Sequence, residues 1–282
     1  MNTKKKILFG IGAVTALVAI YFIYEYFMYV TTDNAQIQAH TVMLAPKVPG
    51  YVVDVKVQEG DFVKKGSLLL SIDDRDYTNT LHKMQNDLGS MQARRKDAES
   101  NHHRLQSLYS KGAVSQQQYE TALAGYTELK SKYEAISAQV SQAELNLQYT
   151  KIVAPSDGFI AKKNVEPGQF ASPGVPVIGF VDAGERWVVA NFKETQIQNI
   201  KIGSLVDIDL DAYPSKDFTG KVVSLSSATG ATFTLLPPDN ATGNFTKVVQ
   251  RIPVKISIEN FKPEDIEFLK AGLSVDVKVH RR

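Results

Sequence analysis

Two copies of one pattern, GYVVDVKVQEGDFVKKGSLLL at residues 50–70 and GFIAKKNVEPGQFASPGVPVI at residues 158–178, decide the fold of this 282-residue chain. The copies lie 108 residues apart, and each has glycine at its first, eleventh and seventeenth positions. Tyr51 corresponds to Phe159 and Phe62 to Phe170, and Ala-Pro lies shortly before each copy. Self-similarity at one constant offset indicates an internal structural repeat.

Each copy has the pattern of short strands separated by glycine turns. About 30 residues cannot bury an adequate core alone, so we expect the two copies to pack against each other. The pattern resembles a biotinyl/lipoyl domain, a flattened sandwich of two similar halves. In carrier domains of that kind a modified Lys lies on the turn between the halves, and here roughly 80 residues replace that turn. The resemblance therefore implies the sandwich without a carrier function, and we expect no cofactor.

The inserted segment, residues 76–150, contains no Pro and has apolar or small residues at alternating intervals of three and four. This spacing is typical of a coiled coil. The first series is Leu81, Met84, Leu88, Met91, Ala98, Leu105 and Tyr109, with Arg95 and His102 at the intervening seam positions. The second series is Tyr119, Ala122, Tyr126, Leu129, Tyr133, Ile136, Val140, Ala143 and Leu147. We therefore predict two helices of about 35 residues, each roughly 50 Å long at 1.5 Å per residue.

The break between the two helices is explicit in the sequence. Lys111-Gly112 is a helix stop, because Gly tolerates the left-handed conformation that ends many helices. Ser115 with Gln118 forms a capping box that starts the next helix. The segment is thus predicted to fold as an antiparallel hairpin. His102-His103 has no clustered third ligand, so we expect a solvated or seam histidine and no metal site.

At the N-terminus, residues 7–24 are uncharged and are preceded by Lys4, Lys5 and Lys6. A helix needs about 20 largely apolar residues to cross a bilayer, and flanking Lys favours a cytoplasmic end. The alternative is a cleavable signal peptide, but bulky aromatic residues follow the run where a small-x-small cleavage site belongs. We predict a single-pass anchor within residues 1–30, with the rest of the chain exported.

In the last third, residues 184–282, the pattern changes to period two. Residues 206–210 (VDIDL) and 275–279 (VDVKV) alternate apolar and charged side chains, as antiparallel strands with one wet face do. We predict a small antiparallel β-barrel. Asp207, Asp209 and Asp211 fall on one strand face, and we interpret them as solvated side chains and not as a cation site.

Composition excludes several classes of function. The chain has 32 Lys and Arg against 30 Asp and Glu, which gives no electrostatic footprint for nucleic acid. The absence of Cys excludes disulfides, thiolate metal sites and Cys nucleophiles. The sequence also lacks a Walker-type phosphate loop, His-Glu-x-x-His and Gly-x-Ser-x-Gly. We therefore expect no enzyme activity, no catalytic residue and no bound metal.

The order of anchor, half-domain, hairpin, half-domain and barrel resembles the HlyD/EmrA-type membrane fusion proteins, the periplasmic adaptors of tripartite efflux and secretion systems. Four stretches carry the resemblance: TTDNA at 31–35, ANFKET at 190–195, LPPDNATGN at 236–244 and VVQRIPV at 248–254. The last two look most like adaptors that serve major-facilitator drug exporters. The implied fold is mainly β with a long coiled-coil hairpin. Its expected domains are an anchor (1–30), a linker strand and first lipoyl-like half (31–75), the hairpin (76–150), the second half (151–183) and the barrel (184–282).

The resemblance implies a function without chemistry. The chain would be anchored in the inner membrane of a Gram-negative bacterium and would link a transporter in that membrane to an outer-membrane channel. The resemblance implies that this transporter is a major-facilitator drug exporter. Several copies would surround a conduit. The alternatives are a type I secretion adaptor working with an ABC transporter, a lipoylated or biotinylated carrier component, and a surface or sensory coiled-coil protein.

The resemblance extends to the predicted hairpin tip. The spacing of Arg104, Leu108 and Ser115 is similar to the family pattern that contacts the outer-membrane channel. At the end of a coiled coil the seam no longer buries its own residues, so Leu108 is available to a partner and Arg104 can hydrogen-bond to one. The alternative reading is structural: Ser115 as a helix cap, Leu108 as a local core residue and Arg104 as a solvated charge.

Overall fold

The computed structural model describes Glu25 and residues 27–229, 249–259 and 261–281. They form two compact units: one from the residues up to His40 with those from Asp182 onward, the other from Thr41–Val181. The predicted anchor at residues 7–24 and the LPPDNATGN stretch at 236–244 lie outside the described residues. Within the described part of the chain, no helix combines the length and the apolar character needed to cross a bilayer.

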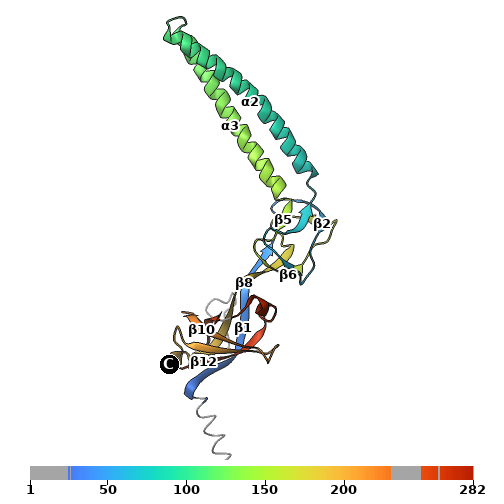
Figure 1. Ribbon diagram of the computed structural model, residues 1–282, viewed down its shortest axis with the longest axis vertical. Coiled ribbons are helices and arrows are strands. Elements are labelled where there is room, and N and C mark those ends of the chain that lie inside the picture. The colour runs from blue at the N-terminus through green and yellow to red at the C-terminus, as the bar shows by residue number, and fades with distance from the viewer. Residues whose placement is uncertain (1–24, 26, 230–248, 260, 282) are drawn as a thin grey trace, which may run out of the picture. The chain divides into compact units, whose positions relative to one another are not determined.

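The sandwich of the second unit is built from the two repeat copies, as predicted (Figure 1). Its strands are β2 (Gly50–Val55), β3 (Phe62–Val63), β4 (Leu68–Ile72), β5 (Lys151–Val153), β6 (Gly158–Lys163), β7 (Phe170–Ala171) and the first residues of β8 (Ile178–Lys193). Its core uses the same positions of both copies. The matched buried pairs are Val52 with Ile160, Val57 with Val165, Val63 with Ala171, Leu69 with Val177, Leu70 with Ile178, and Ile72 with Phe180.

The repeated aromatic residues pair crosswise between the copies. In the β2–β7 ladder Tyr51 lies opposite Phe170, and in the β3–β6 ladder Phe62 lies opposite Phe159. The ring centroids are 5.2 Å and 5.1 Å apart, both in edge-to-face geometry. Two equivalent contacts of this kind indicate that the halves are related by a pseudo-twofold axis. Edge-to-face cross-strand pairs stabilise a sheet even where, as for Tyr51, Phe62 and Phe170, the rings are exposed.

The first glycine of each copy is required by a close approach between strands. A Cβ on Gly158 would lie 2.4 Å from the Phe180 ring and 2.4 Å from the Val181 carbonyl oxygen. A Cβ on Gly50 would lie 2.5 Å from Ile72, which is the residue matched to Phe180. Both copies therefore keep the glycine and place a large apolar side chain, Ile72 or Phe180, in the space that it leaves.

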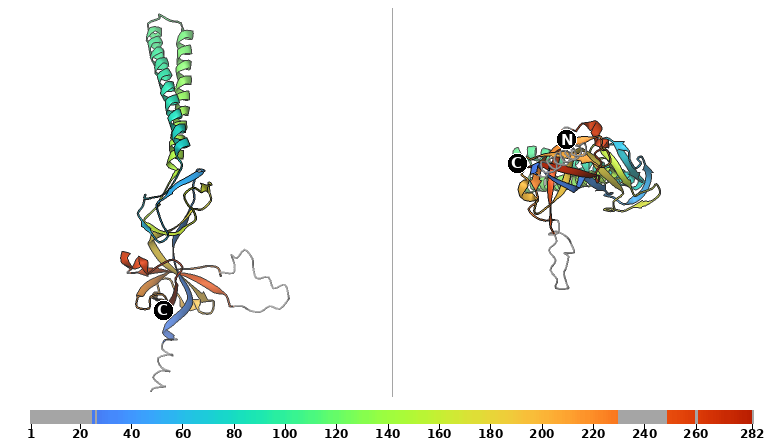
Figure 2. Two further views of the ribbon diagram at one scale, coloured as in Figure 1. Left: turned by 90° about the vertical axis from the view of Figure 1, so that its right-hand side faces the viewer. Right: turned by 90° about the horizontal axis from the view of Figure 1, so that it is seen from below.

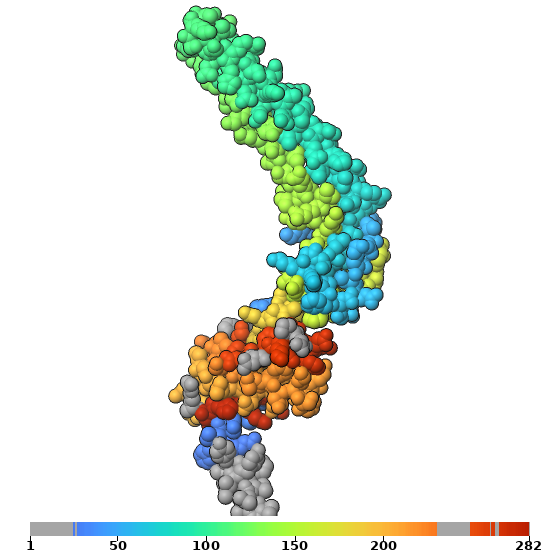
Figure 3. Space-filling view, in the orientation of Figure 1, coloured from blue at the N-terminus to red at the C-terminus, as the bar shows by residue number. Residues whose placement is uncertain are grey.

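The insertion folds as the predicted two-helix hairpin. Helix α2 spans Arg75–Ser110 (36 residues) and α3 spans Gln116–Gln148 (33 residues), and they run side by side in both ribbon views (Figures 1 and 2). The space-filling view shows their side chains in contact along the face of the hairpin that it presents (Figure 3). All predicted seam positions except Tyr109 are buried or half-buried, including Arg95 and His102. The sequence therefore identified which side of each helix faces the other.

The turn of the hairpin also forms as predicted. Gly112 has φ of 75°, its N–H donates to the Tyr109 carbonyl (2.9 Å), and the Ala113 N–H donates to the Leu108 carbonyl (3.0 Å). This pair of bonds is a Schellman motif, which satisfies carbonyls at the end of α2. Ser115 then caps α3: its Oγ accepts from the Gln118 N–H, and its own N–H donates to the Gln118 side chain.

The other end of the hairpin is fixed to the sandwich at one point. The Ile72 N–H donates to the Thr150 carbonyl (2.8 Å), so the residues before α2 and after α3 are directly bonded. The Tyr77 hydroxyl of the first turn of α2 donates to the Pro49 carbonyl (2.7 Å). The hairpin therefore leaves and rejoins the sandwich at the same place.

The first unit is an antiparallel barrel. Its strands are β1 (Tyr29–Leu44), the second part of β8, β9 (Leu205–Leu210), β10 (Asp217–Leu225), β11 (Arg251–Glu259) and β12 (Ser274–His280), with the short helices η1 (Ile197–Asn199) and η3 (Pro263–Glu267). The strand order is β1-β12-β9-β10-β11-β8, and a β1–β8 pairing closes it. The period-two prediction is confirmed: Val206, Ile208 and Leu210 are buried and alternate with half-buried Asp207 and Asp209.

One boundary differs from the sequence interpretation, which placed residues 31–75 in a single domain. Residues 31–40 belong to the barrel unit, where β1 pairs with β12 from Tyr29 opposite His280 to Gln36 opposite Ser274. The barrel predicted for residues 184–282 is therefore completed by a strand from the other end of the chain.

Candidate functional site: hairpin tip and charged barrel pocket

The three residues predicted at the hairpin tip lie close to the turn in the chain. Leu108 is 37% exposed and belongs to neither buried core cluster of the described residues. Arg104, one helical turn earlier, is exposed and donates to the Asn101 side chain (3.1 Å). Ser115 is occupied as the cap of α3. Of these three residues, Leu108 is the one with exposed apolar surface, whereas the cap of α3 is a sufficient structural role for Ser115.

The seam behind the tip is aromatic and polar. Three contacts recur at intervals of seven residues along both helices: Arg95 over the Tyr133 ring (4.5 Å), His102 stacked on Tyr126 (5.6 Å) and Tyr109 stacked on Tyr119 (5.2 Å). His102 is 7% exposed, and neither of its ring nitrogens has a hydrogen-bond partner among the described residues. In this half of the hairpin, stacking and cation–π contacts thus alternate with the small and aliphatic seam residues Ala98, Leu105, Ala122 and Leu129.

A groove of about 670 Å³ lies between the two helices near the turn. It is lined mainly by small and polar side chains: Ala98, Asn101, Leu105, Ser115, Gln117, Gln118, Thr121, Ala122, Gly125, Tyr126 and Leu129. A Cβ on Gly125 would meet no atom within 4 Å, so packing within the hairpin does not require this glycine.

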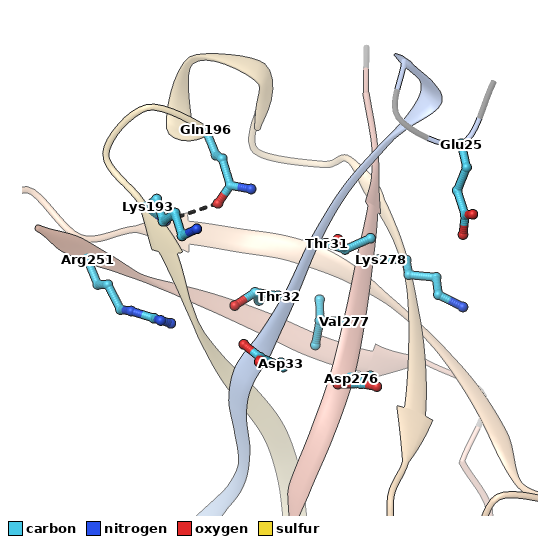
Figure 4. Close-up of a pocket in the computed structure, with 10 residues that line it drawn as sticks. All are labelled: Glu25, Thr31, Thr32, Asp33, Lys193, Gln196, Arg251, Asp276, Val277 and Lys278. Carbon is cyan, nitrogen blue, oxygen red and sulfur yellow. Dashed lines mark hydrogen bonds between the residues drawn. The ribbon is translucent and has the colours of Figure 1, made fainter. Parts of the chain in front are cut away.

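A second pocket, of about 530 Å³, lies on the outer surface of the barrel (Figure 4). Its walls come from β1, β8, β11 and β12, and Glu25 lies at its edge. The lining residues are Glu25, Thr31, Thr32, Asp33, Lys193, Gln196, Arg251, Asp276, Val277 and Lys278. Figure 4 shows Lys193, Gln196 and Arg251 on one side of β1, with Glu25 and Lys278 on the other.

A pinned β-bulge shapes this pocket. The β1–β12 register shifts between Thr32 and Ala35, so two residues of β1 oppose Asp276 alone. The Thr32 hydroxyl donates to the Asn191 carbonyl (3.0 Å), and the Asn191 amide donates to the Asn34 side chain (3.0 Å). Arg251 approaches the same Asn191 carbonyl at 3.5 Å. Bulges re-aim side chains, and this one directs Asp33 into the pocket.

Charged residues of the pocket lie opposite residues of the same charge on the neighbouring strands. Lys193 on β8 lies directly opposite Arg251 on β11, and Asp276 on β12 lies directly opposite Asp209 on β9. Lys278 bonds to Asp209 (3.1 Å), and this hydrogen bond raises the pKa of the Lys278 ammonium. Among the described residues, Lys193, Arg251, Asp33 and Asp276 form no ion pair within 4.0 Å.

The sequence interpretation did not identify this pocket. Its residues come from strands that are far apart in the chain, and local periodicity carries no information on which strands become neighbours. The available signal was the set of family-like stretches, because TTDNA, ANFKET and VVQRIPV each contribute to the lining, with Asp33, Lys193 and Arg251 as their charged members. In the described part of the chain no group of three or more His, Asp or Glu is placed to hold a metal ion.

Comparisons with known proteins agree with this architecture. Residues 40–180 match the family model described as "RND MFP, barrel-sandwich hybrid domain", and residues 186–235 match the "CusB-like, beta-barrel domain". The chain is 34% identical to the colistin resistance protein EmrA of Acinetobacter baumannii, over all of this chain and 96% of that one. It is 33% identical to the multidrug export protein EmrA of Escherichia coli, over 88% of this chain and 76% of that one.

Among solved structures, that of a periplasmic adaptor protein EmrA superimposes with a TM-score of 0.52 at 19% identity, covering 90% of this chain and 99% of the other. That likeness concerns the fold. The match of the sandwich, together with two relatives above 30% identity that this chain covers to 96% and 76%, shows the family. The chain therefore belongs to the EmrA/HlyD-type membrane fusion proteins, the family of periplasmic adaptor proteins.

Proposed function

We propose that the chain is the adaptor subunit of a multidrug efflux system and links an inner-membrane transporter to an outer-membrane channel. The observation that carries the proposal is the hairpin, with helices of 36 and 33 residues inserted at one point of a sandwich. At 1.5 Å per residue it is a rod of about 50 Å, which suits a spacer and provides no enclosed site for chemistry. The adaptor works by positioning other proteins, not by catalysis.

The parts of the chain have separate roles in this proposal. The apolar run at residues 7–24 anchors the protein in the inner membrane, and the barrel and sandwich lie on the periplasmic side. Several copies side by side surround a conduit. The transporter is of the major-facilitator type. Support for this choice over type I secretion comes from relatives named for multidrug export and colistin resistance.

The hairpin tip is the part that docks to the channel. Leu108 supplies exposed apolar surface at the end of the rod, where a partner can bury it. Arg104 supplies a fork of donors for carbonyls or carboxylates of the partner. Because Ser115 already caps α3, its contribution is to hold the turn in shape.

The decisive variant is Leu108→Asp, compared with Leu123→Asp. Both leucines are exposed to a similar degree, 37% and 38%, so neither substitution should unfold the hairpin. We expect Leu108→Asp to abolish drug resistance at normal membrane levels of the protein, and Leu123→Asp to retain it. Arg104→Asp should behave like Leu108→Asp. Wild-type resistance in the Leu108 and Arg104 variants would refute docking through the tip.

The transporter is identified by co-purification of the full-length chain from native membranes after mild cross-linking. We expect a multi-span major-facilitator protein and an outer-membrane channel in the same complex, and ladders of cross-linked adaptor. Recovery of an ABC transporter in place of the major-facilitator protein would favour the secretion alternative.

A further inference from the structure

The charged barrel pocket has a feature that the fold does not need. Lys193 and Arg251 are directly opposite each other on neighbouring strands, and like charges in that position destabilise a sheet. Asp276 is likewise opposite Asp209, with Asp33 next to it on the bulge. In the described structure the two cations and the carboxylates of Asp33 and Asp276 do not neutralise each other. Local rules are broken in this way mainly at functional sites.

The arrangement is polarised across the barrel surface. In strand order, Arg251 lies on β11, Lys193 on β8, Asp33 on β1 and Asp276 on β12. Neighbouring strands are about 4.8 Å apart, so the centres of the cationic and acidic pairs are about 10 Å apart at the backbone. Lys193 and Arg251 have long side chains that shorten this gap. A ligand that satisfies both pairs must carry an anion and a cation within a few bonds of each other.

The position of the pocket in the chain indicates where such a ligand is found. Glu25 lines the pocket and directly follows the uncharged run at residues 7–24. If that run spans the bilayer, as the proposed function requires, the pocket lies at the depth of the lipid headgroups. The abundant headgroup with a phosphate and a primary ammonium a few bonds apart is phosphoethanolamine.

We propose that this pocket binds the phosphoethanolamine headgroup of a membrane phospholipid. Lys193 and Arg251 hold the phosphate through charge-assisted hydrogen bonds, and Asp33 and Asp276 accept hydrogen bonds from the ammonium. The bulge pinned by Thr32 and Asn34 on Asn191 holds Asp33 in place for this contact. The bound lipid would fix the barrel to the membrane surface independently of the anchor.

The test uses the full-length protein in dodecyl maltoside, titrated with dioleoyl phosphatidylethanolamine or dioleoyl phosphatidylcholine, with bound lipid counted by native mass spectrometry. The choline headgroup keeps both charges but cannot donate hydrogen bonds from its nitrogen. We expect at least tenfold tighter binding of the ethanolamine lipid. Arg251→Gln and Asp33→Asn should each weaken the binding of the ethanolamine lipid at least tenfold. Lys255→Gln, on the same strand as Arg251, and Asp211→Asn lie outside the pocket and should bind normally.

Three results would overturn the proposal. The first is equal binding of the two lipids. The second is unchanged lipid binding in both pocket variants, with their folding verified by circular dichroism; if these variants also no longer co-purify with the transporter, the pocket is a protein contact. The third is soluble O-phosphoethanolamine binding as tightly as the lipid, which would assign the site to a free phosphate ester. Lipid binding is measured without transporter or channel. A failure of lipid binding therefore does not bear on the efflux proposal, which the hairpin-tip variants test separately.

Discussion

The two halves of the hairpin are built on one seam pattern but are held together by different interactions. Near the sandwich, the seam is aliphatic, and its members Val140 and Ala143 are buried. Toward the turn, every second seam position of α2 holds Arg95, His102 or Tyr109, and these face Tyr133, Tyr126 and Tyr119. The base half buries apolar surface, whereas the tip half stacks rings and leaves the His102 nitrogens without hydrogen-bond partners in the described structure.

This difference gives the two halves of the hairpin different expected stabilities. Buried apolar side chains contribute about 1.5–3 kcal/mol each, while a buried polar group without a partner costs about 1–3 kcal/mol. We therefore expect the half that adjoins the sandwich to be the more stable one. We expect the seam of the half that ends at the proposed docking surface to repack on a partner at a smaller cost in free energy.

The largest effect is expected for Val140→Asp, which places an unpaired carboxylate in the base seam, where Val140 is 7% exposed. We expect a loss of roughly 3–5 kcal/mol in the free energy of unfolding of the hairpin, because a buried charge without a partner is among the costliest substitutions. Urea denaturation followed by helical circular dichroism measures it. Leu123→Asp should change stability by less than about 0.5 kcal/mol. Equal losses for the two variants would mean that the base seam is not the stabilising half.

In the tip half we expect a substitution that increases the stability of the hairpin. His102→Leu replaces a buried imidazole with no hydrogen bond by an apolar side chain of similar size. We expect the hairpin to become more stable by about 1 kcal/mol, the recovered desolvation cost less the lost stacking on Tyr126. The same denaturation experiment applies. A loss of more than about 1 kcal/mol would show that stacking outweighs desolvation and would erase the contrast between the halves.

A smaller gain is expected for Gly125→Ala in the tip half and Gly89→Ala in the base half. Neither added Cβ would meet an atom within 4 Å, so each alanine should stabilise its helix by about 0.5–1 kcal/mol. Thermal unfolding of the two variants gives the comparison directly. Since Gly125 also lines the groove beside Ser115, resistance assays on the pair test whether the groove is used. A destabilised Gly89→Ala hairpin would contradict the open space seen at that position.

The smallest effect is expected for the stability of the protein at low pH, and it concerns Asp73 and Arg75 where the hairpin joins the sandwich. Hydrogen bonds from the Arg75 side chain and N–H lower the pKa of Asp73 from 3.8 to about 2. A lowered folded-state pKa stabilises the protein above pH 3.8, and this contribution is lost as the pH falls toward 2. Because the pair is exposed to solvent, we expect only a slight fall in melting temperature over that window, absent in Asp73→Asn. An equal fall in both proteins would assign the acid sensitivity to other carboxylates.

Much of the fold was predictable because it is encoded locally or by repetition. The seam spacing placed even Arg95 and His102 correctly, since helical geometry fixes which residues share a face. The constant offset of 108 residues predicted the sandwich, and the matched core pairs follow from it. The capping box at Ser115 needs only four consecutive residues.

What could not be predicted depends on pairing between distant strands. The sequence interpretation placed a linker strand in residues 31–75, but nothing in the local pattern shows that this strand closes a barrel against β12 and β8. The charged pocket was missed for the same reason, because Asp33, Lys193 and Arg251 become neighbours only when that barrel closes. The docking role of Arg104 and Leu108 stays a prediction, which the tip variants can test.

The hydrogen bond between Ile72 and Thr150, which continues the β4–β5 ladder to the start of the hairpin, has a consequence for how proteins of this kind diversify. Since the excursion departs and returns at one spot, whole heptads can be added or deleted in matching amounts on both helices without disturbing the matched β halves. Each such step changes the reach by about 10.5 Å. The length of the hairpin can thus vary independently of the sandwich and can match the distance that the protein has to bridge.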